Sequence, residues 1–498
     1  MERKVVVGGW GQITQPKTLD RTAKNPMGLM AQASRRAAEM LTSKSALTHL
    51  DGIMIVRTLS HHYTSPAKQL AQKLDVRPKF THVSGIGGNS PQTLINIAAG
   101  MIARNELDSV LIVGAETYIQ RKKNPKKIES ALFRGIPKEY TGDDLIGSTT
   151  LENQHGIEYP MHGFPLFETA LWAASGLDLQ AYLMQVGKMW AKFSEIAADH
   201  PYAWTKSMRT PEEIITPGPT NRPVAFPYTK YMNSFVTVDQ GAAVILMSEE
   251  TAKKYSQKNR QTVYFLGGGY AQDRQRFMIE KSDFTSSPPL KAAVEKALAR
   301  SCMPLESLDC FDLYSCFPCA VSIAKKMIGI KNDDPRPLTL TGGLGFFGGP
   351  GNNYSLHGVA TLVEKISIGE KSNGLVTALG WFMHKHAAGV YGSTPLTSEF
   401  KDHDLIDQKN CFAGKGPVKI KDQVTGIGTI ETYTVIYSTD QKPSYAVIYG
   451  RTLDNYRFIA RTQSHLEIFK QLTSENMVGQ KIKIAFNPSK NMNIADLV

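Results

Sequence analysis

Residues 83–116 have the sequence VSGIGGNSPQTLINIAAGMIARNELDSVLIVGAE, which predicts a strand, a glycine-rich turn, a helix and a second strand. Residues 338–381 repeat that order, with the sequence LTLTGGLGFFGGPGNNYSLHGVATLVEKISIGEKSNGLVTALGW. Two such units, about 255 residues apart, indicate a duplicated α/β domain. Each turn directs the N–H groups of a helix start toward one point, which suits binding of an anion or an oxyanion.

The length and composition narrow the class of protein. For 498 residues we expect roughly three domains. No apolar run reaches the roughly 18–20 residues that span a bilayer. The start, MERKVVVGGWGQI, predicts a first strand rather than a signal peptide. Five cysteines, an odd number, argue against a disulfide framework, so we expect a cytoplasmic protein.

The net charge of +12 is compatible with a polyanionic partner such as nucleic acid, a membrane surface or a phosphate-bearing cofactor. The lysines are scattered along the chain, so we favour solubility as the reason for this charge.

Strands and helices alternate through the first half, which predicts a parallel or mixed sheet between helices. Residues from about 117 to 230 interrupt this order and are rich in Tyr, Trp, Met, His and Pro, as in an insertion that covers a site. The second half repeats the order of the first. We therefore expect a first half at residues 1–255, a second half at residues 256–400 and an additional domain at residues 415–498.

Residues 415–498 alternate polar and apolar residues between turns, which predicts a small antiparallel β-barrel. An OB-like barrel of this kind binds nucleic acid by stacking bases on aromatic side chains, for which the candidates are Tyr433, Tyr437, Tyr445, Tyr449 and Tyr456. By alternation, most of them could equally face the barrel core or form cross-strand pairs. We prefer docking of a protein partner to binding of nucleic acid.

Four motifs carry a resemblance to the thiolase superfamily: VDQGAAVILMS at residues 238–248, DLYSCF at 312–317, GGP at 348–350 and FMHKHAAGVYG at 382–392. The resemblance covers about residues 1–400. It implies a duplicated βαβαβαβ five-layer sandwich of the α/β class. The last domain resembles the extra C-terminal domain of the type-1 thiolase-like proteins, which implies a small all-β barrel, OB-like in form. The implied activity is that of an acyltransferase of the acetyl-CoA acetyltransferase kind, with coenzyme A or acyl-CoA as substrate or ligand.

The resemblance places the nucleophilic cysteine of thiolases within Gly88, Asn89 and Ser90, where this chain has no sulfur. A serine hydroxyl needs an adjacent base before it can attack, so Ser90 is no simple replacement. Pro91 beside it is typical of the first helical turn, which makes Asn89 or Ser90 an N-cap. We assign Asn89 and Ser90 to ligand binding at the helix start.

A second thiolase motif, Gly-His-Pro, is replaced here by Gly348, Gly349 and Pro350. Gly349 therefore stands where the resemblance implies a histidine that helps to form the oxyanion hole and assists the nucleophile. We assign Gly348 and Gly349 to ligand binding through their backbone. His357, seven residues past Pro350, is expected to be a packed histidine inside the following helix.

The third motif resembles HDCF of the sterol-carrier-type thiolases, and its cysteine is retained as Cys316 while Tyr314 replaces its histidine. Cys316 precedes a predicted helix, where a thiolate would be stabilised and could act in acid–base chemistry. The alternative is a small buried apolar side chain. Cys316 and Cys319 also form a CxxC, but no second pair exists to complete a zinc site, so we expect no metal.

The second thiolase cysteine is also absent, because its region reads Ala378, Leu379, Gly380. His384 and His386 follow near a strand end, where open α/β sheets carry ligand sites. We assign His386 as a proton donor or an oxyanion contact. A structural histidine is the alternative.

The leading hypothesis is a protein of the thiolase superfamily that acts on or binds acyl-CoA thioesters but lacks cysteine-dependent thiolysis. Three mechanisms remain: non-covalent chemistry with Cys316 and His386, regulatory binding of acyl-CoA, or service as the degenerate half of a complex. The chain is expected to be a monomer or a dimer.

Overall fold

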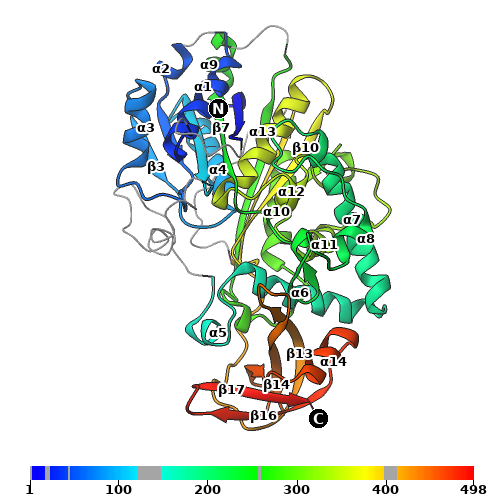
Figure 1. Cartoon of the computed structure of the whole chain (residues 1–498). Coiled ribbons are helices and arrows are strands. Elements are labelled where there is room, and N and C mark those ends of the chain that lie inside the picture. The colour runs from blue at the N-terminus through cyan, green and yellow to red at the C-terminus, as the bar shows by residue number, and fades with distance from the viewer. Residues whose placement is uncertain are drawn as a thin grey trace.

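The computed structural model describes residues 3–16, 23–42, 45–119, 147–255, 260–396 and 412–497 (Figure 1). The first half comprises β1 (Val5–Thr14), α1 (Pro26–Glu39), α2 (Ser45–Thr48), β2 (Gly52–Ile55), α3 (Pro66–Leu74), β3 (Phe80–Val83), α4 (Ser90–Ala103), β4 (Ser109–Thr117), β7 (Asp239–Ser248) and α9 (Glu249–Tyr255). The predicted alternation of strands and helices is confirmed in this half.

The second half comprises β8 (Tyr264–Asp273), η4 (Met278–Glu280), α10 (Pro288–Ser301), η5 (Leu305–Ser307), β9 (Phe311–Asp312), α11 (Pro318–Ile328), α12 (Gly343–Phe346), η6 (Gly351–Asn353), α13 (Tyr354–Ser367), β10 (Asn373–Gly380), β11 (Lys385–Gly392) and β12 (Phe412–Ala413). Beside β9, the carbonyl groups of Pro337 and Leu338 accept hydrogen bonds from the backbone of Phe311 and Leu313. This extended segment occupies the place that β3 holds in the first half.

The main sheet has the strand order β3-β2-β4-β7-β1-β8-β11-β10-β9. From the centre outward, the strands of the first half are β1, β7, β4 and β2, and the equivalent strands of the second half are β8, β11, β10 and β9. In each half the first two pairings are antiparallel and the third is parallel. At the centre β1 and β8 pair antiparallel, through Val6 and Tyr264. An antiparallel junction between two equivalent strands is the arrangement that a pseudo-twofold axis requires, so the predicted duplication is confirmed.

Helices cover the sheet in layers (Figure 1). α1 packs on β1 and β7, and α10 packs on the equivalent strands β8 and β11. α4 and α13 contact each other and strands of both halves, so they form the layer between them. Apolar side chains of α4, of α13 and of strands from both halves form one buried hydrophobic cluster. The α/β sandwich predicted from the sequence is therefore present.

Glycines allow the outer helices to approach β1 and β8 unusually closely. A methyl group on Gly9 would lie 2.2 Å from the Ala37 carbonyl oxygen of α1, and one on Gly269 would lie 1.8 Å from the Ala293 carbonyl oxygen of α10. A glycine on the central strand therefore permits the close approach of the outer helix in both halves. The neighbours are helix backbone, which cannot turn aside as a side chain can.

The insertion contains α5 (Thr150–Gln154), α6 (Pro160–Ser175), α7 (Leu179–Asp199), α8 (Pro211–Ile215), β5 (Pro223–Ala225), β6 (Tyr228–Thr229) and η3 (Lys230–Met232). The stretch LDLQAYLMQVGKMWAKFSEIAADH at residues 177–200 predicts a helix, which the structure confirms as α7, whereas α6 was not predicted. α6 has Pro165 inside it and buries much of its surface, so it lacks the one-sided apolar stripe that marks a surface helix. The part of the insertion at residues 120–146 lies outside the described residues.

The last domain is a closed barrel of five strands, in which β13 (Gly426–Tyr437), β14 (Pro443–Thr452), β15 (Arg457–Thr462), β17 (Met492–Leu497) and β16 (Lys481–Asn487) each pair with the next and β16 returns to β13. α14 (Leu466–Ser474) packs on β13 and β14. The predicted barrel is confirmed, and β17 is a strand that the sequence did not reveal.

The barrel is tied to the insertion rather than tethered by a free linker. β5 pairs with β13 through Ala225 and Ile436, which extends the barrel sheet to seven strands. Two of its tyrosines, Tyr433 and Tyr449, are completely buried. The guanidinium of Arg461 lies 3.5 Å from the ring centroid of Tyr445. These three rings are engaged in packing, so they do not form a platform for stacking bases.

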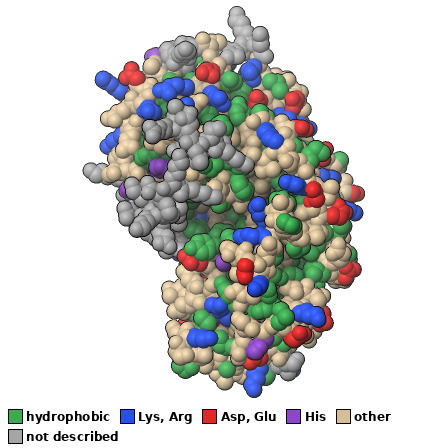
Figure 2. Space-filling model, in the orientation of Figure 1, with side chains coloured by type: hydrophobic (Ala, Val, Ile, Leu, Met, Phe, Trp, Pro, Cys, Tyr) green, Lys and Arg blue, Asp and Glu red, His purple; other side chains and the backbone are tan. Residues whose placement is uncertain are grey.

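On the face shown in Figure 2, Lys and Arg side chains are interspersed with Asp and Glu side chains. This distribution agrees with solubility as the reason for the net charge. Among the described residues, no helix has both the length and the apolar character needed to cross a bilayer.

We expect the substitution Gly269→Ala to lower the free energy of unfolding by about 1–3 kcal/mol, because its methyl group would force α10 away from β8. Gly218→Ala is the matched control, since a methyl group there meets no atom within 4 Å. Chemical denaturation measures both variants. Equal stability of the two would contradict this account of the close approach.

Candidate functional site

The starts of α4 and α13 are joined directly by hydrogen bonds. The N–H group of Gly87 donates to Asn352 Oδ1 at 2.9 Å, and Asn352 Nδ2 donates to the Arg57 carbonyl at 2.9 Å. In the other direction, Ser355 Oγ donates to the Gly88 carbonyl at 3.2 Å. Gly87 has a φ of 146°, which a residue with a side chain rarely adopts. The two glycine-rich turns therefore meet, as the sequence predicted.

Tyr314 occupies the space beside Gly88. A Cβ atom on Gly88 would lie 2.0 Å from Tyr314 Oη and 2.6 Å from the Leu379 carbonyl oxygen. The tyrosine is held by its backbone N–H, which donates to Thr377 Oγ1, and by its ring, which packs edge-on against Tyr354. A phenol hydroxyl thus fills the volume that a side chain at Gly88 would need.

Asn89 occupies the equivalent space beside Gly380. A Cβ atom on Gly380 would lie 2.3 Å from Asn89 Oδ1, and one on Gly87 would lie 2.4 Å from the same oxygen. Asn89 is 5% exposed, and its Nδ2 donates to Thr93 Oγ1 at 3.2 Å. Its Oδ1 has no hydrogen-bond donor among the described residues. In each of the two stretches where the resemblance implies a cysteine, the space beside a glycine is therefore occupied by another polar side chain.

Ser90 begins α4, and Asn89 precedes it at the N-cap position without a side-chain cap. Ser90 Oγ donates to the Gly85 carbonyl at 2.9 Å. The hydroxyl proton is donated to the backbone in this bond, and no base in the described part of the chain is bonded to the oxygen, so these residues do not activate Ser90 for attack. Asn89 and Ser90 both lie at the helix tip, as expected.

Gly348 and Gly349 lie across the site, in the turn before α13. The N–H group of Gly349 donates to the Phe235 carbonyl at 2.9 Å, so it is used inside the protein and does not point to a ligand. A Cβ atom on Gly348 would lie 2.5 Å from Gln240 Oε1, whereas one on Gly349 would meet nothing closer than 3.4 Å. A Cβ atom therefore fits at Gly349, so steric crowding there does not explain the absence of the expected histidine.

Cys316 lies two residues before α11 and is 7% exposed. Burial raises the pKa of its thiol. This effect of burial on the pKa exceeds the opposite effect of the backbone N–H groups of Phe317 and Cys316, which supports the alternative of a small buried side chain. Cys319 is also buried, and its Sγ is 3.5 Å from the Phe164 carbonyl. Among the described residues, no group of three or more His, Cys, Asp or Glu side chains is arranged to hold a metal.

His386 lies on the face of β11 that is turned away from the helix tips. Its Nε2 is 3.0 Å from the hydroxyl of Ser287, at the start of the outer helix α10, and burial lowers its pKa to about 3. Side chains alternate along a strand, so Lys385 takes the opposite face. Lys385 pairs with Gly380, and its Cβ lies 3.3 Å from the Cβ position of that glycine. The structure therefore brings Lys385, rather than the predicted His386, to Asn89.

The turn between β10 and β11 has a strained backbone. Trp381 and Met383 have φ values of 54° and 59°, in the left-handed region. His384 in this turn is 1% exposed, and neither of its ring nitrogens has a hydrogen-bond partner among the described residues. Burial, and after it the charge of Lys385, holds the pKa of His384 well below its usual range.

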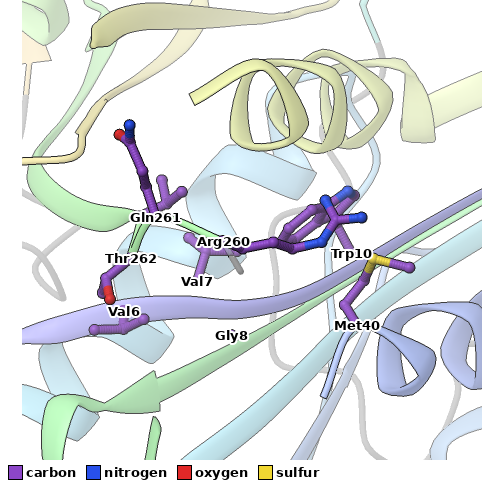
Figure 3. Close-up of a pocket in the computed structure, with 9 residues that line it drawn as sticks. Val6, Val7, Gly8, Trp10, Met40, Arg260, Gln261 and Thr262 are labelled. Atoms are coloured by element: carbon purple, nitrogen blue, oxygen red, sulfur yellow. The ribbon is translucent and has the colours of Figure 1, made fainter. Parts of the chain in front are cut away.

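A separate hollow lies between β1, the end of α1 and the segment before β8, and Figure 3 shows Arg260 beside the ring of Trp10 in it. Arg260 also donates to Ser367, the last residue of α13. α13 has 14 residues, so this hollow is about 20 Å from the helix start. It does not belong to the site at the tips of α4 and α13.

Comparison with solved structures identifies the fold as that of the thiolases. The chain is 30% identical to a monomeric SCP2-thiolase-like protein type 1 from Mycobacterium smegmatis, with a TM-score of 0.82 and 100% of each chain covered. The family profile of the thiolase-like protein type 1 additional C-terminal domain matches residues 410–487. The chain therefore belongs to the SCP2-thiolase-like protein type 1 family.

More distant structures share the fold alone. An Ltp2–ChsH2(DUF35) aldolase is 16% identical, with a TM-score of 0.61 over 78% of this chain and 97% of the other. Acetyl-CoA acetyltransferase from Syntrophomonas wolfei is 14% identical, with a TM-score of 0.56 over 79% and 100%. Human mitochondrial 3-ketoacyl-CoA thiolase is 15% identical, with a TM-score of 0.55 over 79% and 99%. No curated protein sequence matches the chain.

We expect Gly88→Ala to destabilise the protein by about 1–3 kcal/mol, because the new methyl group overlaps Tyr314 Oη. The double variant Gly88→Ala/Tyr314→Leu removes the phenol, so the two effects should not add and the coupling should reach about 0.5–3 kcal/mol. Denaturation of the wild type, both single variants and the double variant measures it. Strict additivity would show that the two residues do not compete for this space.

Buried histidines should make stability depend on pH. Burial lowers the pKa of His357 and His386 to about 3 and that of His200 to about 4, below the ordinary value of about 6.5 in the unfolded chain. The unfolded state then binds more protons, so the free energy of unfolding should fall as the pH drops below 6.5. Replacement of His357 by Gln should flatten this slope by up to about 1.4 kcal/mol per pH unit. Denaturation curves between pH 5.5 and pH 8 measure the slope, and parallel curves would contradict it.

Proposed function

We propose that this chain binds acyl-CoA thioesters without forming a covalent acyl-enzyme. The proposal is carried by the two stretches where the thiolase resemblance implies cysteines, residues 88–90 and 378–380, neither of which holds a sulfur. Within them, the side-chain space at Gly88 and Gly380 is occupied by Tyr314 and Asn89. Covalent acyl transfer needs an activated nucleophile. Burial raises the pKa values of both Tyr314 and Cys316, so neither supplies one at neutral pH.

The remaining architecture supports binding of a CoA ester. The two helix starts that meet at the site favour anionic or partly negative groups. Two structures with the same fold are named as an acetyl-CoA acetyltransferase and a 3-ketoacyl-CoA thiolase. Coenzyme A esters are thus the class of ligand that we propose, with no choice of acyl chain.

Service as the non-catalytic member of a complex is the alternative, and the barrel would be its docking domain. Ile427 is 39% exposed and Leu453 is 81% exposed. They lie close together, because Gly428 and Thr452 are paired on β13 and β14. Exposed apolar side chains that gather at one end of a domain are typical of contact surfaces. A protein partner would bind there, away from the side of the barrel that is paired with β5.

We expect isothermal titration calorimetry to detect binding of acetoacetyl-CoA, while addition of free CoA produces no thiolysis above the rate without protein. Loss of the absorbance of the thioester enolate measures the reaction. Thiolysis at a rate typical of enzymes, about 1 s⁻¹ or faster, would contradict the proposal. Absence of binding by any CoA ester would contradict it as well.

Roles for Cys316 and His386 in non-covalent chemistry stay predictions, and two variants test them. If the proposal of binding alone is right, Cys316→Ala and His386→Ala should bind acetoacetyl-CoA as the wild type does. A slow conversion of the ester by the wild type that disappears in both variants would instead assign chemistry to these residues. Conversion that survives in both would exclude them.

A further inference from the structure

Five residues converge where the two cysteines of a thiolase are missing: Gly88, Asn89, Tyr314, Gly380 and Lys385. Tyr314 Oη lies 2.0 Å from the Cβ position of Gly88, and Asn89 Oδ1 lies 2.3 Å from the Cβ position of Gly380. Each glycine therefore has a polar group directly in front of it. The third polar side chain, Lys385, is 3% exposed and starts from the residue paired with Gly380.

The direction of Lys385 follows from the pairing of β10 and β11. Side chains of directly opposed residues lie on the same face of a sheet. The Cβ direction of Gly380 points to Asn89 Oδ1, so Lys385 leaves the sheet on the face of Asn89 and the start of α4. Further along β11, Tyr391 donates to Gln92 of α4, which confirms that this face is turned to the central layer.

The three groups have different hydrogen-bonding roles. Burial raises the pKa of Tyr314 well above its ordinary value, so its hydroxyl keeps its proton and donates. A lysine ammonium group only donates. Asn89 is only 5% exposed. Its Oδ1 can only accept hydrogen bonds, and no donor among the described residues bonds to it. A buried acceptor without a partner indicates a group that the protein alone does not supply.

A nucleophile and a hydrogen-bond donor act differently toward the same carbonyl. A sulfur at Gly88 would attack the carbonyl carbon, whereas a hydroxyl in that place donates to the carbonyl oxygen and leaves the thioester intact. The ligand that matches two donors and one acceptor has a carbonyl oxygen with an N–H or O–H group nearby. An acyl-CoA has both, in its thioester and in the amides of its pantetheine arm.

We propose that Tyr314 and Lys385 contact the thioester carbonyl oxygen of a bound acyl-CoA, which lies against the polar groups that occupy the space beside Gly88 and Gly380. This inference rests on the proposed binding of acyl-CoA. Its consequence is selectivity: the protein distinguishes a CoA thioester from a CoA derivative that has no carbonyl group. No bond to the ligand forms or breaks.

The test compares two ligands that differ only in that oxygen, butyryl-CoA and its thioether analogue S-butyl-CoA. Calorimetric titration gives a dissociation constant for each with the full chain. We expect the wild type to bind butyryl-CoA about tenfold more tightly than S-butyl-CoA, the ratio that one or two hydrogen bonds provide. In Tyr314→Phe and Lys385→Met, this ratio should fall to about threefold or less, while binding of S-butyl-CoA is unchanged.

Matched controls separate this effect from general damage. Tyr391→Phe removes a hydroxyl on the same face that bonds Gln92 instead of facing Gly88 or Gly380, and Lys365→Met removes a lysine that pairs with Glu370 near the end of α13. Both should retain the preference of the wild type for the thioester. Thermal denaturation shows whether each variant is folded.

The outcomes distinguish this inference from the proposed function. Equal binding of the two ligands by the wild type, or a preference that persists in both Tyr314→Phe and Lys385→Met, would overturn the contact and leave acyl-CoA binding in place. Failure of the wild type to bind either ligand, or free CoA, would overturn the proposed function itself. A preference that is lost in the site variants and kept in the controls supports the assignment.

Discussion

The mutual hydrogen bonding of two helix starts holds the centre of this protein together. The turn before α4 donates to Asn352, and Ser355 of α13 donates back to the turn at Gly88. Side chains of the second half thereby satisfy backbone groups of the turn that precedes α4 in the first half. Because α4 and α13 are buried between the two sets of strands, these bonds are shielded from water and have few alternatives. The position of every residue at the site depends on this junction.

The same junction explains how a thiolase fold persists without thiolase cysteines. A site that loses two sulfur atoms would leave voids, and voids in a packed interior are costly. Tyr314 and Asn89 fill the two spaces, and each requires a glycine opposite it. The glycines and the polar side chains are therefore a matched set.

The barrel is integrated with the rest of the chain through a buried carboxylate. Glu152 of the insertion accepts hydrogen bonds from the N–H groups of Thr149 and Ile279 and from the hydroxyl of Tyr449 on β14. Three parts of the chain, namely the insertion, the second half and the barrel, meet at this one side chain. Burial raises the pKa of Glu152, and these donors oppose that shift. Together with the β5–β13 pairing, it fixes the barrel against the α/β part.

Much of the fold could be predicted because it follows from local periodicity. Repeated strand–turn–helix order indicated the duplication, and alternating residues after position 415 indicated a barrel, since both patterns depend on neighbours in sequence. α6 and β17 were not predicted, because α6 is apolar on most sides and β17 has only six residues. Neither has a periodic signal.

The amino-acid sequence by itself determined which groups are absent: no sulfur within residues 88–90 or 378–380 and no histidine at Gly349. Only the tertiary structure decided which side chains replace them. Tyr314 and Lys385 are more than 200 residues from Gly88, and contacts over such distances leave no pattern in one sequence. The choice between His386 and Lys385 depends on strand register, because a shift of one residue exchanges the two faces of a sheet.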